Sequence, residues 1–205
     1  MGQLVAYEFV TLDGVIQAPG GPDEDHEGGF AHGGWQAPYV DPEAGQLIAD
    51  HYSRVKAILL GRKTYENFAS YWPQAPLGNP FAKVMNGARK YVASRTLDHV
   101  DWENTSLLTG DIPAEVARLK EMHDAVQLIG SGHLLQTLLQ HDLVDRLNLW
   151  IYPLLLGTGK RLFAGGTIPA ALRLLTSQTF ASGAVFLTFE FAGKPTYGAL
   201  DEEQP

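Results

Sequence analysis

The sequence contains no cysteine, and this absence removes several classes of chemistry. Disulfide bonds, zinc sites built on thiolates and cysteine nucleophiles are all excluded. The chain also lacks an apolar run of about 20 residues, which a membrane-spanning helix needs. Its amino terminus lacks the basic segment of a secretory signal. We therefore expect a cytoplasmic protein with no membrane partner.

Basic residues are scarce. Lys and Arg number 15 against 23 Asp and Glu, which gives a net charge of −8. A nucleic-acid-binding surface needs a basic face to neutralise phosphates, so we expect no nucleic-acid partner. The length of 205 residues and a hydrophobic fraction of 45% are typical of one globular domain with its own core.

Two nucleotide-binding fingerprints are also missing, since the chain has neither a GxGxxG segment nor a P-loop. The acidic and His residues between Asp23 and Glu27 are consecutive and follow no ligand spacing. Such a run is typical of a solvated loop rather than a metal centre. We therefore expect no bound metal.

Hydrophobic periodicity predicts alternating strands and helices. Strands are expected at residues 3–10, 55–60, 90–94, 106–109, 125–129, 143–155, 172–179 and 185–191. Helices are expected at residues 42–54, 64–71, 112–123 and 133–140. This order predicts an α/β domain, residues 1–193, with a mostly parallel central sheet and an antiparallel C-terminal hairpin. Residues 194–205 are expected to form a polar tail.

Glycine marks two predicted strand-to-helix junctions, Leu60–Glu66 and Ile129–Leu134. Free backbone N–H groups and the helix dipole make such a junction an anion site. A tight turn is the alternative for one junction alone, but two junctions at one sheet edge favour a phosphorylated cofactor. A third strand ends in Ser94-Arg95-Thr96, which offers two hydroxyl groups and a guanidinium.

Five segments in this order resemble the dihydrofolate reductase superfamily. Within it they are most similar to the reductase domain of bifunctional riboflavin-biosynthesis enzymes, and to its small stand-alone bacterial members. The segments are Thr11–Gly14, Leu60–Glu66, Lys90–Thr96, Gly130–Gly132, and Leu143–Leu147 with Pro153–Gly159. The resemblance covers about residues 3–191. It implies a three-layer dihydrofolate reductase-like fold and NADPH as the cofactor.

Carried over by position, the resemblance implies a set of cofactor-binding residues. Cofactor phosphates would lie against Gly61, Arg62 and Thr64, the adenosine 2′-phosphate against Ser94, Arg95 and Thr96, and the pyrophosphate against Gly130, Ser131, Gly132 and Leu134. Ala6 would lie near the nicotinamide. Two arginines near a 2′-phosphate predict a preference for NADPH over NADH.

The substrate end departs from dihydrofolate reductase. In the segment from Trp35 to Asp41 the acid lies one residue further on than in that enzyme, so folate is not the expected substrate. The candidate catalytic residues are Asp13, Tyr39 and Asp41. Asp41 is also a natural helix N-cap, and Asp13 precedes Gly14 as a turn residue would, so both interpretations stay open.

We therefore expect an NADPH-dependent reductase of a small pteridine- or pyrimidine-like heterocycle. Its activity would resemble that of dihydrofolate reductase or of 5-amino-6-(5-phosphoribosylamino)uracil reductase. The alternatives are a sensor or assembly protein that binds NADPH without turnover and, more weakly, a flavin-binding protein. Glycines between Gly20 and Gly34 predict a lid over the site.

A homodimer is also expected, since the riboflavin-reductase branch is commonly dimeric. Trp150, Tyr152 and residues 154–156 are apolar and lie on a late strand, where they suit a two-fold contact. The alternative is that these residues line a second buried face of the sheet.

Overall fold

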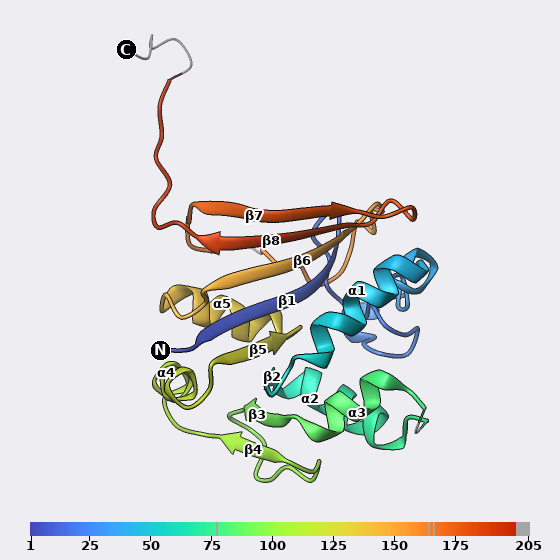
Figure 1. Cartoon of the computed structure of the whole chain (residues 1–205), viewed down its shortest axis with the longest axis vertical. Coiled ribbons are helices and arrows are strands. Elements are labelled where there is room, and N and C mark those ends of the chain that lie inside the picture. Colours follow the sequence, from blue (N-terminus) through green and yellow to red (C-terminus); the bar gives the residue numbers. More distant parts are fainter. Residues whose placement is uncertain (77, 164, 166, 200–205) are drawn as a thin grey trace.

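The computed structural model describes residues 1–76, 78–163, 165 and 167–199, and a mixed sheet lies at its centre (Figure 1). The strands follow the order β4-β3-β2-β5-β1-β6-β8-β7. Their bounds are β1 Gln3–Thr11, β2 Ala57–Gly61, β3 Arg89–Ala93, β4 Thr105–Leu108, β5 Ala125–Ile129, β6 Arg146–Tyr152, β7 Leu172–Thr179 and β8 Val185–Phe191. Neighbours from β4 to β6 run parallel, and β8 runs antiparallel to β6 and β7. The predicted fold class is confirmed.

Helices cover both faces of the sheet and complete three layers. One face carries α1 (Pro42–Ser53), α2 (Arg62–Tyr71) and α3 (Pro80–Gly87), and the other carries α4 (Ile112–Met122) and α5 (Gly132–Gln140). Short 3₁₀ turns lie at Glu27–Gly29, Ala37–Tyr39 and Trp72–Gln74. Because helices lie above and below it, β2 is buried along its first four residues. This explains why its sequence is continuously apolar instead of alternating.

Helix α3 is an element that the sequence prediction missed. Asn79 accepts hydrogen bonds from the backbone N–H groups of Phe81 and Ala82, so it is the N-cap, and a proline follows it. At the other end of α3, the Lys90 ammonium donates to the carbonyl oxygens of Met85 and Ala88, each at 3.0 Å. A fully buried lysine therefore satisfies carbonyl groups that a helix C-terminus leaves without partners.

Two residues of the predicted dimer contact, Trp150 and Tyr152, are not available for it. Trp150 is 0% exposed and Tyr152 is 1% exposed, so both belong to the core. Trp150 Nε1 donates to the hydroxyl of Tyr7 at 2.6 Å, which ties β6 to β1. For these two residues the alternative interpretation, a second buried face of the sheet, holds. Leu155 is 70% exposed, and a two-fold contact through residues 154–156 stays a prediction.

The exterior shows two further features. None of the described helices is long and apolar enough to cross a bilayer. Residues 194–199 have no regular secondary structure and extend away from the sheet (Figure 1). The remainder of the predicted tail, residues 200–205, lies outside the described residues.

Candidate active site

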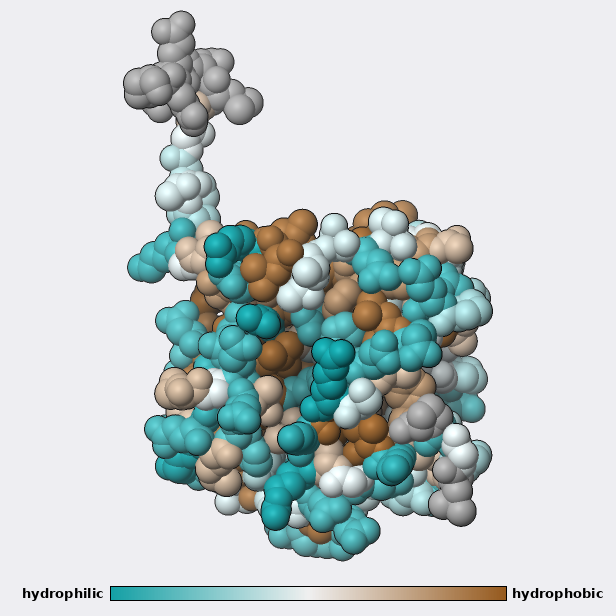
Figure 2. Space-filling model, in the orientation of Figure 1, coloured by the Kyte–Doolittle hydropathy of each residue, from teal (hydrophilic) through white to brown (hydrophobic). Residues whose placement is uncertain are grey.

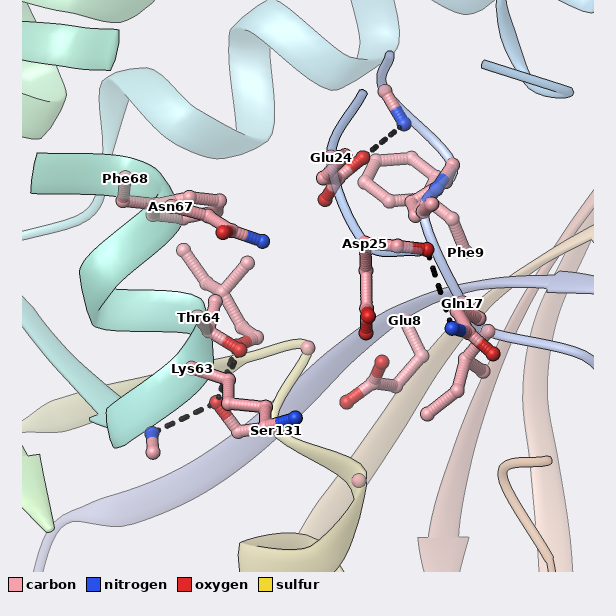
Figure 3. A pocket seen from close by; sticks show the side chains of 18 of the residues that line it. Glu8, Phe9, Gln17, Glu24, Asp25, Lys63, Thr64, Asn67, Phe68 and Ser131 are labelled. Carbon is pink, nitrogen blue, oxygen red and sulfur yellow. Dashed lines mark hydrogen bonds between the residues drawn. The ribbon is translucent and has the colours of Figure 1, made fainter. Parts of the chain in front are cut away.

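A cavity of about 1450 Å³ lies where the parallel strands β1, β2, β3 and β5 end (Figure 3). Ligands of open α/β sheets bind at the carboxyl ends of the strands. The three strand-end junctions singled out in the sequence all line this cavity. Residues 16–25, which follow β1, form another wall, and α1, α2 and α3 contribute side chains to the remainder.

Two of the helices whose first turns line this cavity, α2 and α5, differ from the others in how they are capped. Helices α1, α3 and α4 have side-chain N-caps, supplied by Asp41, Asn79 and Asp111. Helices α2 and α5 have no side-chain cap. Their first-turn N–H groups are therefore left for another acceptor, and an anion is the acceptor that the helix dipole favours.

Ser131 joins the two uncapped junctions. Its Oγ accepts a hydrogen bond from the N–H of Gly61 at 2.9 Å and lies 3.1 Å from Oγ1 of Thr64 (Figure 3). Gly130 and Ser131 both have positive φ, 53° and 65°, which turns the chain sharply into α5. The fold thus brings together two groups of predicted cofactor residues that are about 70 positions apart in sequence.

The remaining predicted cofactor residues differ in position. Gly132 and Leu134 line the cavity beside Ser131. Ala6 does not line it, because this residue is fully buried within β1, where it pairs with Leu128 of β5. Its predicted place near the nicotinamide stays a prediction.

The junction after β3 presents one cation. Arg95 and Thr96 are exposed and line the cavity, whereas the Ser94 hydroxyl accepts the N–H groups of Thr96 and Leu97 and holds the loop. Arg62 donates twice to Glu66, at 3.0 and 3.1 Å. Within the described part of the chain Arg95 has no ion-pair partner.

Ion pairs fasten the segment that follows β1. Glu27 pairs with both Lys63 and Lys160, and these two partners lower the pKa of its carboxyl to about 2. Lys160 also pairs with Asp25. Further along, Trp35 is buried and donates from Nε1 to a backbone carbonyl at 2.7 Å. The glycine-rich part of the segment around Glu27 is therefore held by ion pairs, and the part around Trp35 is anchored in the core.

The three predicted catalytic residues lie outside the cavity lining. Asp13 accepts from the Thr11 hydroxyl and from two backbone N–H groups, and these bonds lower its pKa. Asp41 caps α1 through the N–H of Ala44, which lowers its pKa, and accepts from the N–H of Ser182. Tyr39 packs its ring against Tyr152. A catalytic role for these residues stays a prediction; both carboxyls are ionised at neutral pH, so neither carries a proton to donate.

Glu8 is the cavity residue that the sequence prediction missed. Its side chain is 1% exposed and points into the cavity, and no hydrogen-bond partner of its Oε1 occurs among the described residues (Figure 3). Burial raises the pKa of this carboxyl to about 8. The available signal was a single acidic residue within the otherwise apolar run of residues 4–10.

Comparison with known proteins agrees with this architecture. Residues 3–186 match the RibD C-terminal domain. The chain belongs to this family. The resemblance to the riboflavin-biosynthesis reductase domain is thereby confirmed, and the match covers every element from β1 to the beginning of β8.

Two relatives of this RibD C-terminal domain protein come from Bacillus subtilis (strain 168). The uncharacterized protein YyaP is 30% identical over 189 residues, which cover 90% of this chain and 92% of YyaP. The uncharacterized protein YwjB is 26% identical over 177 residues, which cover 86% of this chain and 91% of YwjB. Both relatives thus align with this chain along nearly their whole length.

Two solved structures share the fold. One is a candidate riboflavin biosynthesis protein from Shewanella sp. PV-4, with a TM-score of 0.70 and 20% identity, covering 92% of this chain and 98% of that one. The other is a pyrimidine reductase-like protein from Corynebacterium diphtheriae, with a TM-score of 0.63 and 13% identity, covering 93% and 92%. At these identities the likeness shows that the chain has the RibD C-terminal domain fold.

Proposed function

We propose that this protein is an NADPH-dependent reductase of a small heterocyclic substrate. The observation that carries the proposal is the pair of uncapped helix N-termini, α2 and α5, which face one cavity and meet at Ser131. A pyrophosphate suits such a pair, because it presents anionic oxygens to two sets of backbone N–H groups. Membership of the RibD C-terminal domain family supports the same assignment.

The layout of the sheet edge fits an extended dinucleotide. Three strand spacings separate β3 from β1, which is about 14 Å at the usual spacing of strands. The junction of β5 and α5 lies between these two ends and would hold the pyrophosphate. Arg95 at the end of β3 would take the 2′-phosphate, and the nicotinamide would lie toward β1.

The cofactor would supply a hydride, and the chain would position the acceptor and exclude water. Residues 16–25 cover the cavity on the β1 side. The wall between α1 and α3 is mostly apolar, with Ile48, Phe81 and Met85. A flat heterocycle such as a pteridine or pyrimidine suits apolar walls together with the carboxyl of Glu8.

Titration of the purified protein with NADPH, NADH and FMN tests the proposal, followed by assays of NADPH oxidation with dihydropterins and substituted uracils. We expect tight NADPH binding and oxidation with one acceptor class. Binding without any turnover would favour the sensor, and preferential FMN binding would favour a flavoprotein.

A matched pair of variants tests the position of the site. Gly130→Val is expected to weaken NADPH binding at least tenfold, because Gly130 has a φ of 53° beside Thr64. Gly183→Val imposes comparable strain in the β7–β8 turn, where φ is 84°, and is expected to leave binding unchanged.

A further inference from the structure

Reduction of a heterocycle by hydride also requires a proton, and the proposed site must supply it. We infer that Glu8 is the catalytic acid, the group that gives the substrate this proton. The inference rests on the proposed function. It goes beyond that function by assigning the acid to β1 instead of to the loop and helix N-terminus where Asp13 and Asp41 lie.

The topology places Glu8 where the cavity reaches the sheet. β1 pairs with β5 only as far as Tyr7, opposite Ile129, so Glu8 is the first residue of β1 beyond the end of β5. On its other side β1 continues to pair with β6, with Glu8 opposite Leu149. The backbone of Glu8 is thus held by one neighbour, while its side chain points into the cavity (Figure 3).

The surroundings of Glu8 keep its proton in place. Its Oε1 is buried without a partner among the described residues, and burial disfavours the carboxylate. The titratable groups on other parts of the cavity wall are Asp23, Glu24, Asp25, Tyr52, Lys63, Tyr71, His133 and Lys160, and the guanidinium groups of Arg62 and Arg95 also line it. Both lysines are already paired with acids, and burial is the one cause of the raised pKa of Glu8. A carboxylic acid that keeps its proton near neutral pH is the type of group that general acid catalysis requires.

The proton step balances with the hydride. For a C=N acceptor, the carbon receives the hydride and the electron pair of the π bond moves to nitrogen. The nitrogen takes the proton from Glu8, so an O–H bond breaks and an N–H bond forms. Glu8 would be left as a carboxylate, and the positive charge of an oxidised nicotinamide bound toward β1, as proposed above, would stabilise it. Solvent restores the proton once the products leave.

The same charge relation gives a test that requires no substrate. NADP⁺ has a positive ring and NADPH a neutral one, so NADP⁺ binding is expected to release a proton from Glu8. We would measure the Kd of both nucleotides between pH 6 and pH 9.5, and the proton released on binding at pH 7.5 with an indicator dye. Any titration of the 2′-phosphate is common to both nucleotides and cancels in the ratio of the two Kd values.

For the natural chain we expect the ratio of the NADP⁺ Kd to the NADPH Kd to fall about tenfold or more as pH rises through this range. In Glu8→Gln the ratio is expected to stay constant with pH. In Glu8→Asp, which keeps a carboxyl, it is expected to fall as pH rises, as it does in the natural chain. Glu121→Gln removes an exposed carboxyl from α4, outside the cavity lining, and is expected to behave as the natural chain does.

Two results would overturn the inference. One is a pH-independent ratio, with no excess proton release, in the natural chain; this needs no variant to fold. The other is an unchanged pH dependence in Glu8→Gln. Both presuppose that NADPH binds, so they differ from failure of the proposed function, in which neither nucleotide binds.

Discussion

The carboxyl of Glu8 makes the stability of the fold depend on pH. Its pKa is about 8 in the folded chain and 4.5 ordinarily, so the folded chain binds more protons between these values. The free energy of unfolding therefore falls as pH rises through this window. Glu8→Gln has no carboxyl to titrate, so its free energy of unfolding should not show this fall. At about 1.4 kcal/mol per pKa unit, the stability of Glu8→Gln relative to the natural chain should rise by several kcal/mol between pH 5 and pH 9.

Urea denaturation at pH 5, 7 and 9 measures this difference. Asp23→Asn serves as the control, because its carboxyl is exposed and its removal is expected to leave the pH dependence intact. If the free energy of unfolding depends on pH in the same way in Glu8→Gln and in the natural chain, Glu8 is already ionised in the folded protein across this range and its pKa is not raised.

Arg95 is expected to determine the preference for NADPH. Arg62 is held by Glu66, whereas Arg95 reaches the cavity without a partner in the described part of the chain. Because a charge-assisted hydrogen bond contributes about 1.5–3 kcal/mol, Arg95→Ala should weaken NADPH binding about 10- to 100-fold and leave NADH binding nearly unchanged.

Fluorescence titration of both nucleotides measures this preference. Arg89→Ala is the matched control, since Arg89 is exposed at the opposite end of the same strand, away from the cavity. Equal loss of both nucleotides in Arg95→Ala would show that Arg95 does not contact the 2′-phosphate.

Junction residues and Glu8 differ in how far the sequence alone can identify them as cavity residues. Junction residues such as Gly61 and Ser131 were predictable, because glycine and hydroxyl groups at strand ends have a local physical meaning. Glu8 carries no such local signal. Its role depends on where β5 ends beside β1, and this contact joins residues more than 120 positions apart.

Among the elements, the segment over the cavity is predicted to contain two parts of unequal mobility. Phe30 and Trp35 are buried, so the later part is anchored in the core. Residues 19–29 include Gly28 and Gly29 at positive φ. They are held by ion pairs and by hydrogen bonds from Gln17 Nε2 to the carbonyl oxygens of Asp25 and Glu27. Amide hydrogen exchange at residues 19–29 should slow severalfold when NADPH saturates the protein, with little change at residues 30–36.

Mass-spectrometric peptide mapping with and without NADPH distinguishes the two parts. Exchange in helix α4 provides the internal reference. This helix packs on the opposite face of the sheet from α1, α2 and α3, and only its first two residues line the cavity. Unchanged exchange at residues 19–29 at saturation would show that they do not act as a lid.

The C-terminus of α3 depends on Lys90. Lys90→Met keeps most of the side-chain volume but removes the donor for the carbonyl groups of Met85 and Ala88, and it removes the cation that lies 4.3 Å from the centre of the Trp102 ring. We expect a loss of about 2–4 kcal/mol in the free energy of unfolding, because buried acceptors are left unpaired. Lys83→Met, at an exposed position of α3, should change it little. Equal stabilities in urea denaturation would contradict this.

A comparison of the β7–β8 hairpin with helix α3 shows which elements the sequence predicts and which it does not. The hairpin strands β7 and β8 were predicted with their observed bounds, because their β-branched and aromatic residues flank a clear Ser-Gly turn. Helix α3 is absent from the sequence prediction, although Asn79-Pro80, an N-cap residue followed by proline, is a helix-start signal.

At the scale of the whole molecule, the alternation of strands and helices predicted a parallel sheet but not its strand order. β5 lies between β2 and β1, and this insertion creates the meeting of α2 and α5 at Ser131. No local pattern specifies which parallel strands become neighbours. The strand order therefore explains why the residues predicted to bind phosphate line one cavity, and their binding of phosphate stays a prediction.

The outer strand β7 suggests how a dimer would form. β7 is the last strand in the order and has β8 as its partner within the described chain. Leu174 is 50% exposed, and Leu172 and Leu175 are partly exposed beside it. Figure 2 shows hydrophobic atoms at the end of the molecule where β7 and β8 lie. We propose a homodimer in which two copies of β7 pair antiparallel about a two-fold axis, since an unpaired edge with apolar side chains is a template for another strand.

Sedimentation velocity measures the mass in solution. The natural chain should sediment at about twice 22.4 kDa, and the double variant Leu172→Glu plus Leu174→Glu should approach 22.4 kDa, because charges on both copies repel and cannot be buried. Met122→Glu changes a more exposed apolar residue on α4, a helix that contacts β5, and should remain dimeric. A monomeric natural chain at high concentration, or a dimer that survives the double variant, would assign β7 to the monomer surface. In either case the cavity would remain complete, because its lining comes from residues 8–137 and Lys160 of a single chain.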